Sequence, residues 1–465
     1  MFILNKDILH LIFEYLEDNK NDLYSCLLVN KTWCEIIVLI LWRDPWNELT
    51  NFPHFRSTML LLNVIISHIQ DEAKVKEVYN YFKNSGIHLS SRQRPLLNYI
   101  RFCKHLNLGS IMNITEYIKD LSERLIVEDE IFKLFINRDV KITYLYIPKK
   151  FNCQLHLIPE AKICFSKIKF LKCYTNIGNN ILTGLSECKS IENLALFIES
   201  SNNNYEIIKL IKAQKKLVNV YFGSYDDYHE PQDEPFCKIL ENSLIKHSNT
   251  IQYFARFKPF TTEILSSLTN LKSLELHGDQ LFEESKWKCL ENLSLPSLQF
   301  LILQDFPVKY LISLIENTKG SLTIIELHNY GNFYSENENE RIIHSIYQNC
   351  PKLIYLTFTP QVGNIIEIEK LLTTCQYLIG LRIISNYGFN WDNFFNALTK
   401  ISPINLYKFC FENNFSMEIA HIKFFIDNWK GRNPIFLKLQ CKTMEIKYLL
   451  EEYELEGRIA EYDEW

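Results

Sequence analysis

The sequence of 465 residues predicts an α/β fold, in which a helical N-terminal region precedes a long stack of strand-and-helix repeats. Two observations support this prediction. A short apolar pattern recurs through the later part of the chain, and segments with helical spacing lie between its copies. The earlier part has apolar residues at helical spacing instead. We therefore expect a small all-helical unit over residues 1–46, a helical joint over 47–140 and the repeats over 141–465.

The repeated pattern is apolar-x-x-apolar-x-apolar, with a mean period of about 26 residues. Clear copies begin at Ile168, Ile191, Leu217, Leu271, Leu298, Leu322, Leu353, Leu378 and Leu406, and weaker ones at Ile142 and Ile251. Helical segments such as EIIKLIKAQ and ERIIHSIYQ precede several copies. One such unit cannot bury its apolar face alone, so neighbours must stack into a solenoid. The expected shape is a horseshoe with parallel strands on its concave face.

Three cysteines occupy one position of this repeat. Cys188, Cys350 and Cys375 each precede the first apolar residue of a copy by three residues, which predicts buried thiols at a helix-to-strand corner rather than a redox or metal role. The 13 cysteines form no C-x-x-C pair, so we expect free thiols in a reducing compartment and no metal site. The arrangement resembles the cysteine-containing class of leucine-rich repeats.

Residues 1–46 carry apolar faces, part of which we expect a partner to cover. Ile8, Leu9, Ile12 and Leu16 recur at helical spacing, and Asn5 can cap that helix. A unit this small can hardly bury all of its apolar faces alone.

Residues 8–42 resemble an F-box, with an "LVNKTW" element at 28–33 and a closing Leu-Trp at 41–42. The whole chain resembles fungal F-box/leucine-rich-repeat proteins. It departs from the family by having Asn5 where Pro is usual, with Asp7 in the acidic position.

The resemblance implies a receptor of a Skp-cullin-F-box ubiquitin ligase. Its F-box would bind a Skp-type adaptor, and through it a cullin, while the repeats hold a target protein. Residues carried over by position would form or support the adaptor-facing surface, or belong to the internal core of the F-box: Leu4, Ile8, Leu9, Ile12, Leu16, Leu28, Val29 and Trp33. Residues 47–140, which contain no Gly/Ser-rich linker, would form a rigid joint.

Alternation along the strands predicts which side chains face the target. The candidates are large aromatic or cationic residues, as binding hot spots favour: Tyr221, Tyr253, Phe257, Phe300, Tyr355 and Arg382. Two longer repeats carry acidic insertions at 223–236 and 329–340. These insertions either steer a basic target or are solvated loops.

Other function classes have little support. The phosphate-loop, dinucleotide-binding, zincin and nucleophile-elbow motifs are missing from the sequence, so we expect no catalytic residue and no cofactor. His277 and His328 are a whole repeat apart, too far to share a zinc ion, and Cys410 has no assignable base. A net charge of −5 argues against nucleic acid as a partner. With neither a signal peptide nor a spanning segment, we expect no membrane partner and an intracellular location, cytoplasmic or nuclear.

Two alternatives stay open at this stage. The chain is a non-ligase interaction scaffold if its F-box is degenerate, or, with less support, an enzyme with its site in the concave groove. The segment from Met444 predicts a capping helix followed by an acidic tail.

Overall fold

The computed structural model describes residues 5–17, 19–47, 49, 55–89, 94–95, 97–149, 151, 153–224, 233–278, 284–329, 334–385, 388–412, 417–440 and 443–464. The chain divides into two compact units, Met1–Leu217 and Val218–Trp465. This division lies within the predicted repeat region. Leu4, one of the residues expected at the adaptor surface, lies outside the described residues.

The first unit begins with helices α1 (Lys6–Tyr15), α2 (Lys20–Cys26) and α3 (Lys31–Leu41), each capped by an asparagine. The Asn5 side chain accepts from the backbone N–H of Asp7, so the residue that replaces the usual proline does start the helix. Asn19 and Asn30 cap the next two helices in the same way. The three helices enclose a small core made of Leu9, Phe13, Leu23, Ile36, Ile37 and Ile40.

The rest of the first unit alternates helices with short strands. Its elements are α5 (Phe55–Ile66), α6 (Glu72–Asn84), η1 (Ile100–Phe102), β1 (His105–Asn107), α7 (Leu108–Thr115), α8 (Leu121–Phe135), β2 (Tyr144–Tyr146), η2 (Leu155–Leu157), α9 (Ala161–Phe165), β3 (Phe170–Tyr174), α10 (Asn179–Gly184), β4 (Asn193–Phe197) and α11 (Glu206–Ala213). Strands β1 to β4 pair in parallel and in chain order. Because β1 pairs with β2, the sheet starts inside the segment that the sequence predicted as a helical joint.

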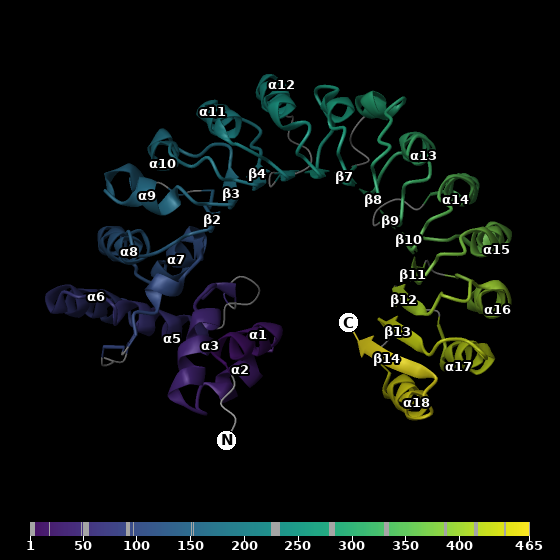
Figure 1. The fold of residues 1–465 in the computed structure, drawn as a ribbon, viewed down its shortest axis with the longest axis horizontal. Helices are drawn as coiled ribbons and strands as arrows, with labels where there is room; N and C mark the ends of the chain where they lie inside the picture. The colour runs from purple at the N-terminus through teal and green to yellow at the C-terminus, as the bar shows by residue number, and fades with distance from the viewer. Residues whose placement is uncertain are drawn as a thin grey trace. The chain divides into compact units, whose positions relative to one another are not determined.

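The second unit continues the same alternation. Its elements are β5 (Asn219–Gly223), α12 (Glu234–Ser243), η3 (Leu244–His247), β6 (Tyr253–Arg256), η4 (Ile264–Ser267), β7 (Ser273–His277), η5 (Glu284–Leu290), β8 (Phe300–Gln304), α13 (Val308–Glu316), β9 (Ile324–His328), α14 (Glu336–Asn349), β10 (Tyr355–Phe358), η6 (Val362–Asn364), α15 (Ile365–Thr374), β11 (Gly380–Ile384), α16 (Trp391–Ile401), β12 (Lys408–Glu412), α17 (Ile419–Asn428), β13 (Ile435–Leu439), α18 (Met444–Leu455) and β14 (Ile459–Glu464). Strands β5 to β14 pair in parallel and in order. Within this unit the strands line the inner, concave side and the helices lie on the outer side (Figure 1).

The strands alternate as the pattern requires. In β7, Leu274 and Leu276 are buried under the helices, whereas Ser273, Glu275 and His277 are partly exposed on the concave face. Such strand-and-helix repeats with parallel strands confirm the predicted leucine-rich-repeat solenoid.

The cysteines at the repeat corners are buried thiols, as predicted. Cys188, Cys350 and Cys375 are at most 1% exposed. The thiols of Cys188 and Cys375 donate to the backbone oxygens of Ile168 and Cys350, each in the preceding repeat. Burial raises the pKa of the Cys350 and Cys375 thiols to about 12, so both stay protonated and unreactive.

The end of the chain differs from the prediction. Helix α18 forms where expected and buries Ile446, Leu450 and Tyr453, but the acidic segment after it forms strand β14 along β13 instead of a tail. Among the described residues, no helix combines the length and apolar character needed to cross a bilayer.

Candidate interaction surfaces

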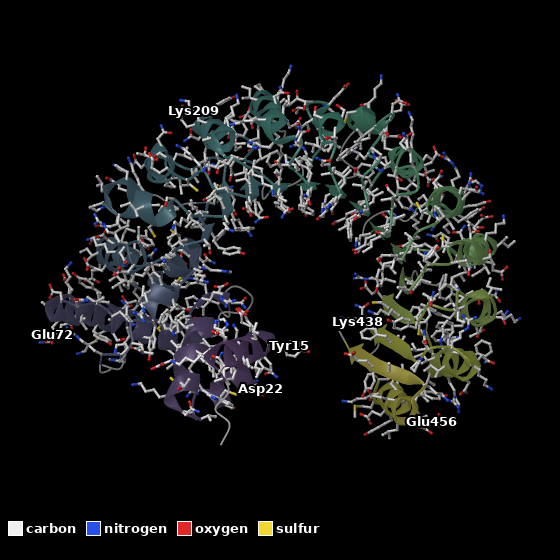
Figure 2. The ribbon with its side chains drawn as sticks, viewed as in Figure 1. Tyr15, Asp22, Glu72, Lys209, Lys438 and Glu456 are labelled. Atoms are coloured by element: carbon white, nitrogen blue, oxygen red, sulfur yellow. The ribbon has the colours of Figure 1, made fainter. Side chains whose placement is uncertain are left out.

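Helix α1 presents an apolar stripe to solvent. Ile8, Leu11, Ile12 and Tyr15 follow one another at i, i+3, i+4 and i+7, so they share one face of the helix. Their exposed fractions are 46%, 66%, 43% and 90%. Figure 2 shows Tyr15 projecting away from the three helices. We call these four residues the α1 stripe.

Other residues of the predicted adaptor set face inward. Leu9 is 3% exposed and packs with Phe13 in the small core, against which Leu16 also lies. Trp33 packs edge-on against Phe13, with 5.0 Å between the ring centroids. These three residues can hold the exposed surface in place but offer little of it to a partner.

The turn between α2 and α3 adds a second exposed apolar group. Leu28 is 89% exposed and Val29 is 56% exposed, and the turn is closed by hydrogen bonds from their amides to Ser25 and Cys26. Large apolar side chains exposed on a small domain are typical of surfaces that bind a partner.

Hydrogen bonds join the end of these helices to the first repeat strand. The carbonyl of Arg43 accepts from the amides of Lys104 and His105 at 2.9 and 3.1 Å. The buried Trp46 ring donates from Nε1 to the His105 carbonyl at 2.8 Å, and Asp44 lies 3.0 Å from His105 Nδ1. The N-terminal helices are therefore bonded directly to β1, and the rigidity of the joint stays a prediction.

Arg43 also fastens α1. Its guanidinium donates to Glu14 at 2.7 Å and to Glu17 at 3.2 Å. The hydrogen bond from Arg43 holds the pKa of Glu14 below its usual value, so this ion pair is present at neutral pH.

The six predicted target-binding residues all lie partly exposed in the second unit, on β5, β6, β8, β10 and β11 or directly after them. Tyr221 and Phe257 are in ring contact at 5.3 Å, and Phe257 stacks on His277 at 3.7 Å. Tyr355 lies across Gly380, where a Cβ atom would stand only 2.3 Å from its ring. A larger residue at 380 would displace that ring, so the glycine sets the local shape of the concave face.

Charged groups accompany these rings. Glu275 accepts from the Tyr253 hydroxyl at 2.6 Å and lies 2.8 Å from His277 Nε2, and Glu326 lies 3.2 Å from His328 Nε2. Arg382 donates from Nε to Glu412 at 2.8 Å. His277 and His328 thus bind neighbouring carboxylates, and no group of His, Cys, Asp and Glu in the described parts of the chain is arranged to hold a metal ion.

Beneath the concave face, a buried ion pair ties α12 to β6. Glu241 and Arg256 are 0% and 2% exposed at their side chains, and their charged atoms lie 3.0 Å apart. Glu241 also accepts from the Thr261 amide and the Thr262 hydroxyl. Arg256 donates to the carbonyls of Lys258 and Pro259. The pair fixes the chain after β6, which carries Phe257.

The acidic insertions are described only in part. Asp226, Asp227 and Glu230 lie outside the described residues. Asp233 caps α12, and Glu338 forms a capping box with Ser335 at the start of α14. A steering role for these insertions remains a prediction.

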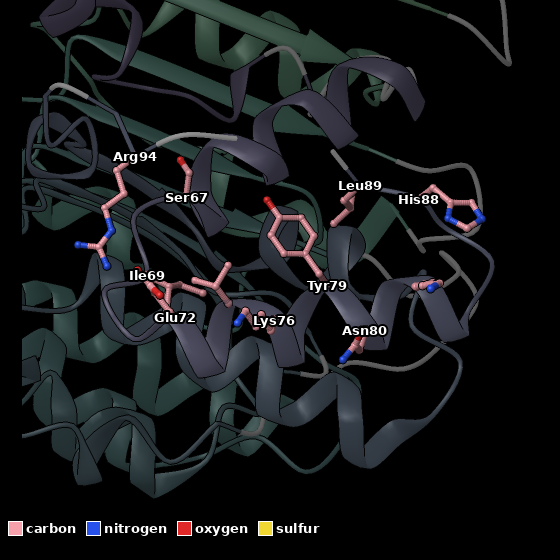
Figure 3. A pocket seen from close by; sticks show the side chains of 11 residues that line it. Ser67, Ile69, Glu72, Lys76, Tyr79, Asn80, His88, Leu89 and Arg94 are labelled. Carbon is pink, nitrogen blue, oxygen red and sulfur yellow. The ribbon is translucent and has the colours of Figure 1, made fainter. Parts of the chain in front are cut away.

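A groove of about 470 Å³ lies beside α6 in the first unit. Figure 3 shows Arg94 and His88 on opposite sides of it, with Tyr79 and Lys76 between them. The Ser67 hydroxyl donates to the carbonyl of Val64, so this hydroxyl is bonded to the backbone of the preceding turn.

Comparison with known proteins bears on the N-terminal helices. A protein-family model described as F-box-like matches residues 6–48. These residues form an F-box-like domain. It precedes the leucine-rich-repeat fold. No curated protein matches the chain.

Solved structures that are similar include two bacterial leucine-rich-repeat proteins. One from Legionella pneumophila is 13% identical with a TM-score of 0.38, over 62% of this chain and 98% of that one. One from Leptospira interrogans is 16% identical with a TM-score of 0.30, over 66% and 74%.

The sequence prediction omitted Leu11 and Tyr15, two of the most exposed members of the α1 stripe. Their 3–4 spacing with Ile8 and Ile12 was the available signal. The prediction instead followed Leu9 and Leu16, which the structure places on the opposite, inward face.

Proposed function

We propose that this protein is the substrate-recognition subunit of a Skp-cullin-F-box ubiquitin ligase. The F-box-like domain binds a Skp-type adaptor, and through it a cullin, and the concave face of the repeats binds a target protein. The chain itself carries out no chemistry in this proposal. It acts inside the cell by bringing the target to the ligase.

The observation that carries the proposal is the exposed apolar surface of the F-box-like domain. The α1 stripe, Leu28 and Val29 are large apolar groups left in water by a domain whose inward faces are already satisfied. Covering such surface with a partner is favourable by about 25 cal/mol for each Å² removed from water. An adaptor would supply that cover.

The attachment of the F-box-like domain to the first repeats also supports the receptor role. A receptor must hold its adaptor and its target in a defined relation, and the bonds from Arg43, Asp44 and Trp46 to β1 fix the F-box-like domain to the first repeats of its own unit.

Co-expression with a Skp-type adaptor tests the proposal. The full-length chain should co-elute with the adaptor in size-exclusion chromatography, and I8D/I12D should abolish co-elution because both charges would be buried in the interface. The matched control is I163D/I366D, which places two aspartates at positions 56% and 64% exposed, on α9 and α15. The control should co-elute as the wild type does.

Elution of the folded wild-type protein alone would overturn the ligase role and favour the non-ligase scaffold. Co-elution of I8D/I12D as complete as that of the control would show that the α1 stripe is not the adaptor surface. Circular dichroism of each variant establishes that the repeats remain folded.

A further inference from the structure

Helix α6 forms one wall of the groove of about 470 Å³ that lies beside it, which we call the α6 groove. Four residues of this wall follow one another at i, i+4, i+7 and i+11 and so share one face of the helix: Glu72, Lys76, Tyr79 and Lys83. A different face of α6 carries the buried residues Val78 and Phe82. The helix therefore turns one side to the core of its unit and another to the groove.

The α6 groove is basic although the chain as a whole has a net charge of −5. Three permanent cations and one carboxylate occur among the described residues that line it: Lys76, Lys83, Arg94 and Glu72. Glu77, the other acidic residue within α6, lies on another face and accepts a hydrogen bond from the Tyr81 hydroxyl. The groove thus runs against the charge of the chain, and an anionic ligand suits it.

Lys76 and Lys83 are available to such a ligand. Both residues are exposed, and in the described part of the chain neither ammonium group forms an ion pair or a hydrogen bond. Lys74, on another face of α6, is instead paired with Glu130 at 2.5 Å. The lysines that face the groove are therefore the ones that the protein leaves without a counter-charge.

The remaining walls combine a held cation with aliphatic surface. Arg94 lies across the groove from His88 (Figure 3), and its guanidinium donates to the carbonyl of Gln70 at 2.7 Å. Ile69 and Leu89 line the groove between the charged groups. A ligand with apolar groups between its anions would cover this surface.

The spacing of the two lysines limits the kind of anion. They are seven residues apart, or about 10.5 Å along the helix axis at 1.5 Å per residue. Two separate anions match that spacing better than one compact anion does. In a polyproline II segment, which advances about 3.1 Å per residue with three residues per turn, side chains three residues apart point the same way and lie about 9 Å apart.

We propose that the α6 groove binds a short acidic segment of a partner protein in an extended, polyproline II-like conformation. Two carboxylates three residues apart pair with Lys76 and Lys83, and the residues between them cover the aliphatic wall. The groove includes neither the α1 stripe nor any concave strand of the second unit. It is therefore a further binding surface, beyond the two in the proposed function.

Fluorescence anisotropy with the full-length protein tests this. The probe is a fluorescein-labelled 12-residue peptide that carries Glu-Pro-Pro-Glu in a Gly/Ser background. It should bind saturably, more weakly as the salt concentration rises, and a Gln-Pro-Pro-Gln version should not bind. Pro-Glu-Glu-Pro, which keeps the charge and changes the spacing, should bind several-fold more weakly.

Variants of the chain identify the groove as the site. K76Q/K83Q should raise the dissociation constant roughly tenfold, because exposed ion pairs contribute modestly. The matched control is K238Q/K423Q, which neutralises two exposed lysines on α12 and α17, and it should bind as the wild type does. K76E/K83E should lose the acidic peptide and bind a Lys-Pro-Pro-Lys version, which a misfolded protein would not do.

The inference fails if the acidic peptide shows no saturable binding, if the Gln version binds equally, or if K76Q/K83Q binds as the wild type does. A labelled oligodeoxythymidylate that binds more tightly than the peptide, and loses affinity in K76Q/K83Q, would overturn it in favour of nucleic acid. Adaptor co-elution of K76Q/K83Q is measured separately and should be unchanged. Failure of this inference and failure of the ligase role are therefore distinguishable.

Discussion

Removing two exposed leucines of the F-box-like domain should weaken adaptor binding without unfolding the domain. In L11A/L28A each change deletes three carbons, worth about 2.4 kcal/mol per leucine at about 0.8 kcal/mol per carbon when fully buried. Scaling by exposed fractions of 66% and 89% gives about 1.6 and 2.1 kcal/mol. If the adaptor covers both side chains, the dissociation constant should rise by two to three orders of magnitude.

Isothermal titration of the full chain with a Skp-type adaptor measures this effect. The matched control is L121A/L455A, which truncates leucines that are 64% and 91% exposed on α8 and α18, and it should bind with unchanged affinity. L9A is a second control, which truncates a buried leucine instead of an exposed one. Because Leu9 is buried in the core, its truncation should lower the free energy of unfolding by about 2–5 kcal/mol, without deleting exposed surface.

The reasoning would be refuted by L11A/L28A binding the adaptor as tightly as the wild type. It would also be refuted by a folded L9A protein that loses affinity as strongly as the double variant, because the inward residues would then form the contact.

Three further predictions concern stability and reactivity. E241Q should destabilise the second unit by about 3–5 kcal/mol, since it leaves the buried Arg256 without its charge partner; equal denaturation midpoints of E241Q and wild type would contradict this. Cys350 should resist alkylation at pH 8 until the protein unfolds, because burial raises the pKa of its thiol to about 12. Labelled Cys350 in native samples, detected by mass spectrometry, would contradict the burial of this thiol. W46F should lower the melting temperature and speed amide exchange in β1, because it removes the bond to the His105 carbonyl; unchanged exchange would show that the bond is not what fixes this joint.

The repeats could be predicted because their pattern is dictated by burial. Each strand needs a buried residue at every second position, as Leu274 and Leu276 of β7 show, and each helix needs one apolar face. That requirement recurs in every unit, so even weak copies align. The burial of Cys188, Cys350 and Cys375 at the corners of the repeats could be predicted for the same reason.

The first and last strands, β1 and β14, were not predicted from the sequence, and the reason is physical. Strand β1 has three residues and buries only Leu106 between partly exposed neighbours, which is too short to produce a visible pattern. Strand β14 has the sequence IAEYDE, and its acidic residues suggested a solvated tail. What holds each of these strands is pairing of its backbone with a neighbour, which places little demand on side chains.

The candidate surfaces were predicted less well than the fold, because exposure depends on packing that a helical pattern does not specify. Leu9 and Ile12 are both apolar and three residues apart, yet one fills the core and the other faces solvent. Packing against α3 determines which face of α1 is buried, because Ile36, Ile37 and Ile40 of α3 cover the Leu9 side. Only the assembled three-helix domain shows which face remains open.

The bonds between the F-box-like domain and β1 bear on how a bound adaptor would be positioned. A flexible linker would allow the adaptor to move freely relative to the repeats, whereas here the carbonyl of Arg43 and the ring of Trp46 are bonded to Lys104 and His105. The Arg43 side chain in turn holds α1 through Glu14 and Glu17. One residue thus joins the helix that carries the α1 stripe to the strand that starts the sheet. The adaptor surface should therefore keep a fixed orientation to strands β1 to β4, and loss of Arg43 should loosen that orientation before it affects adaptor affinity.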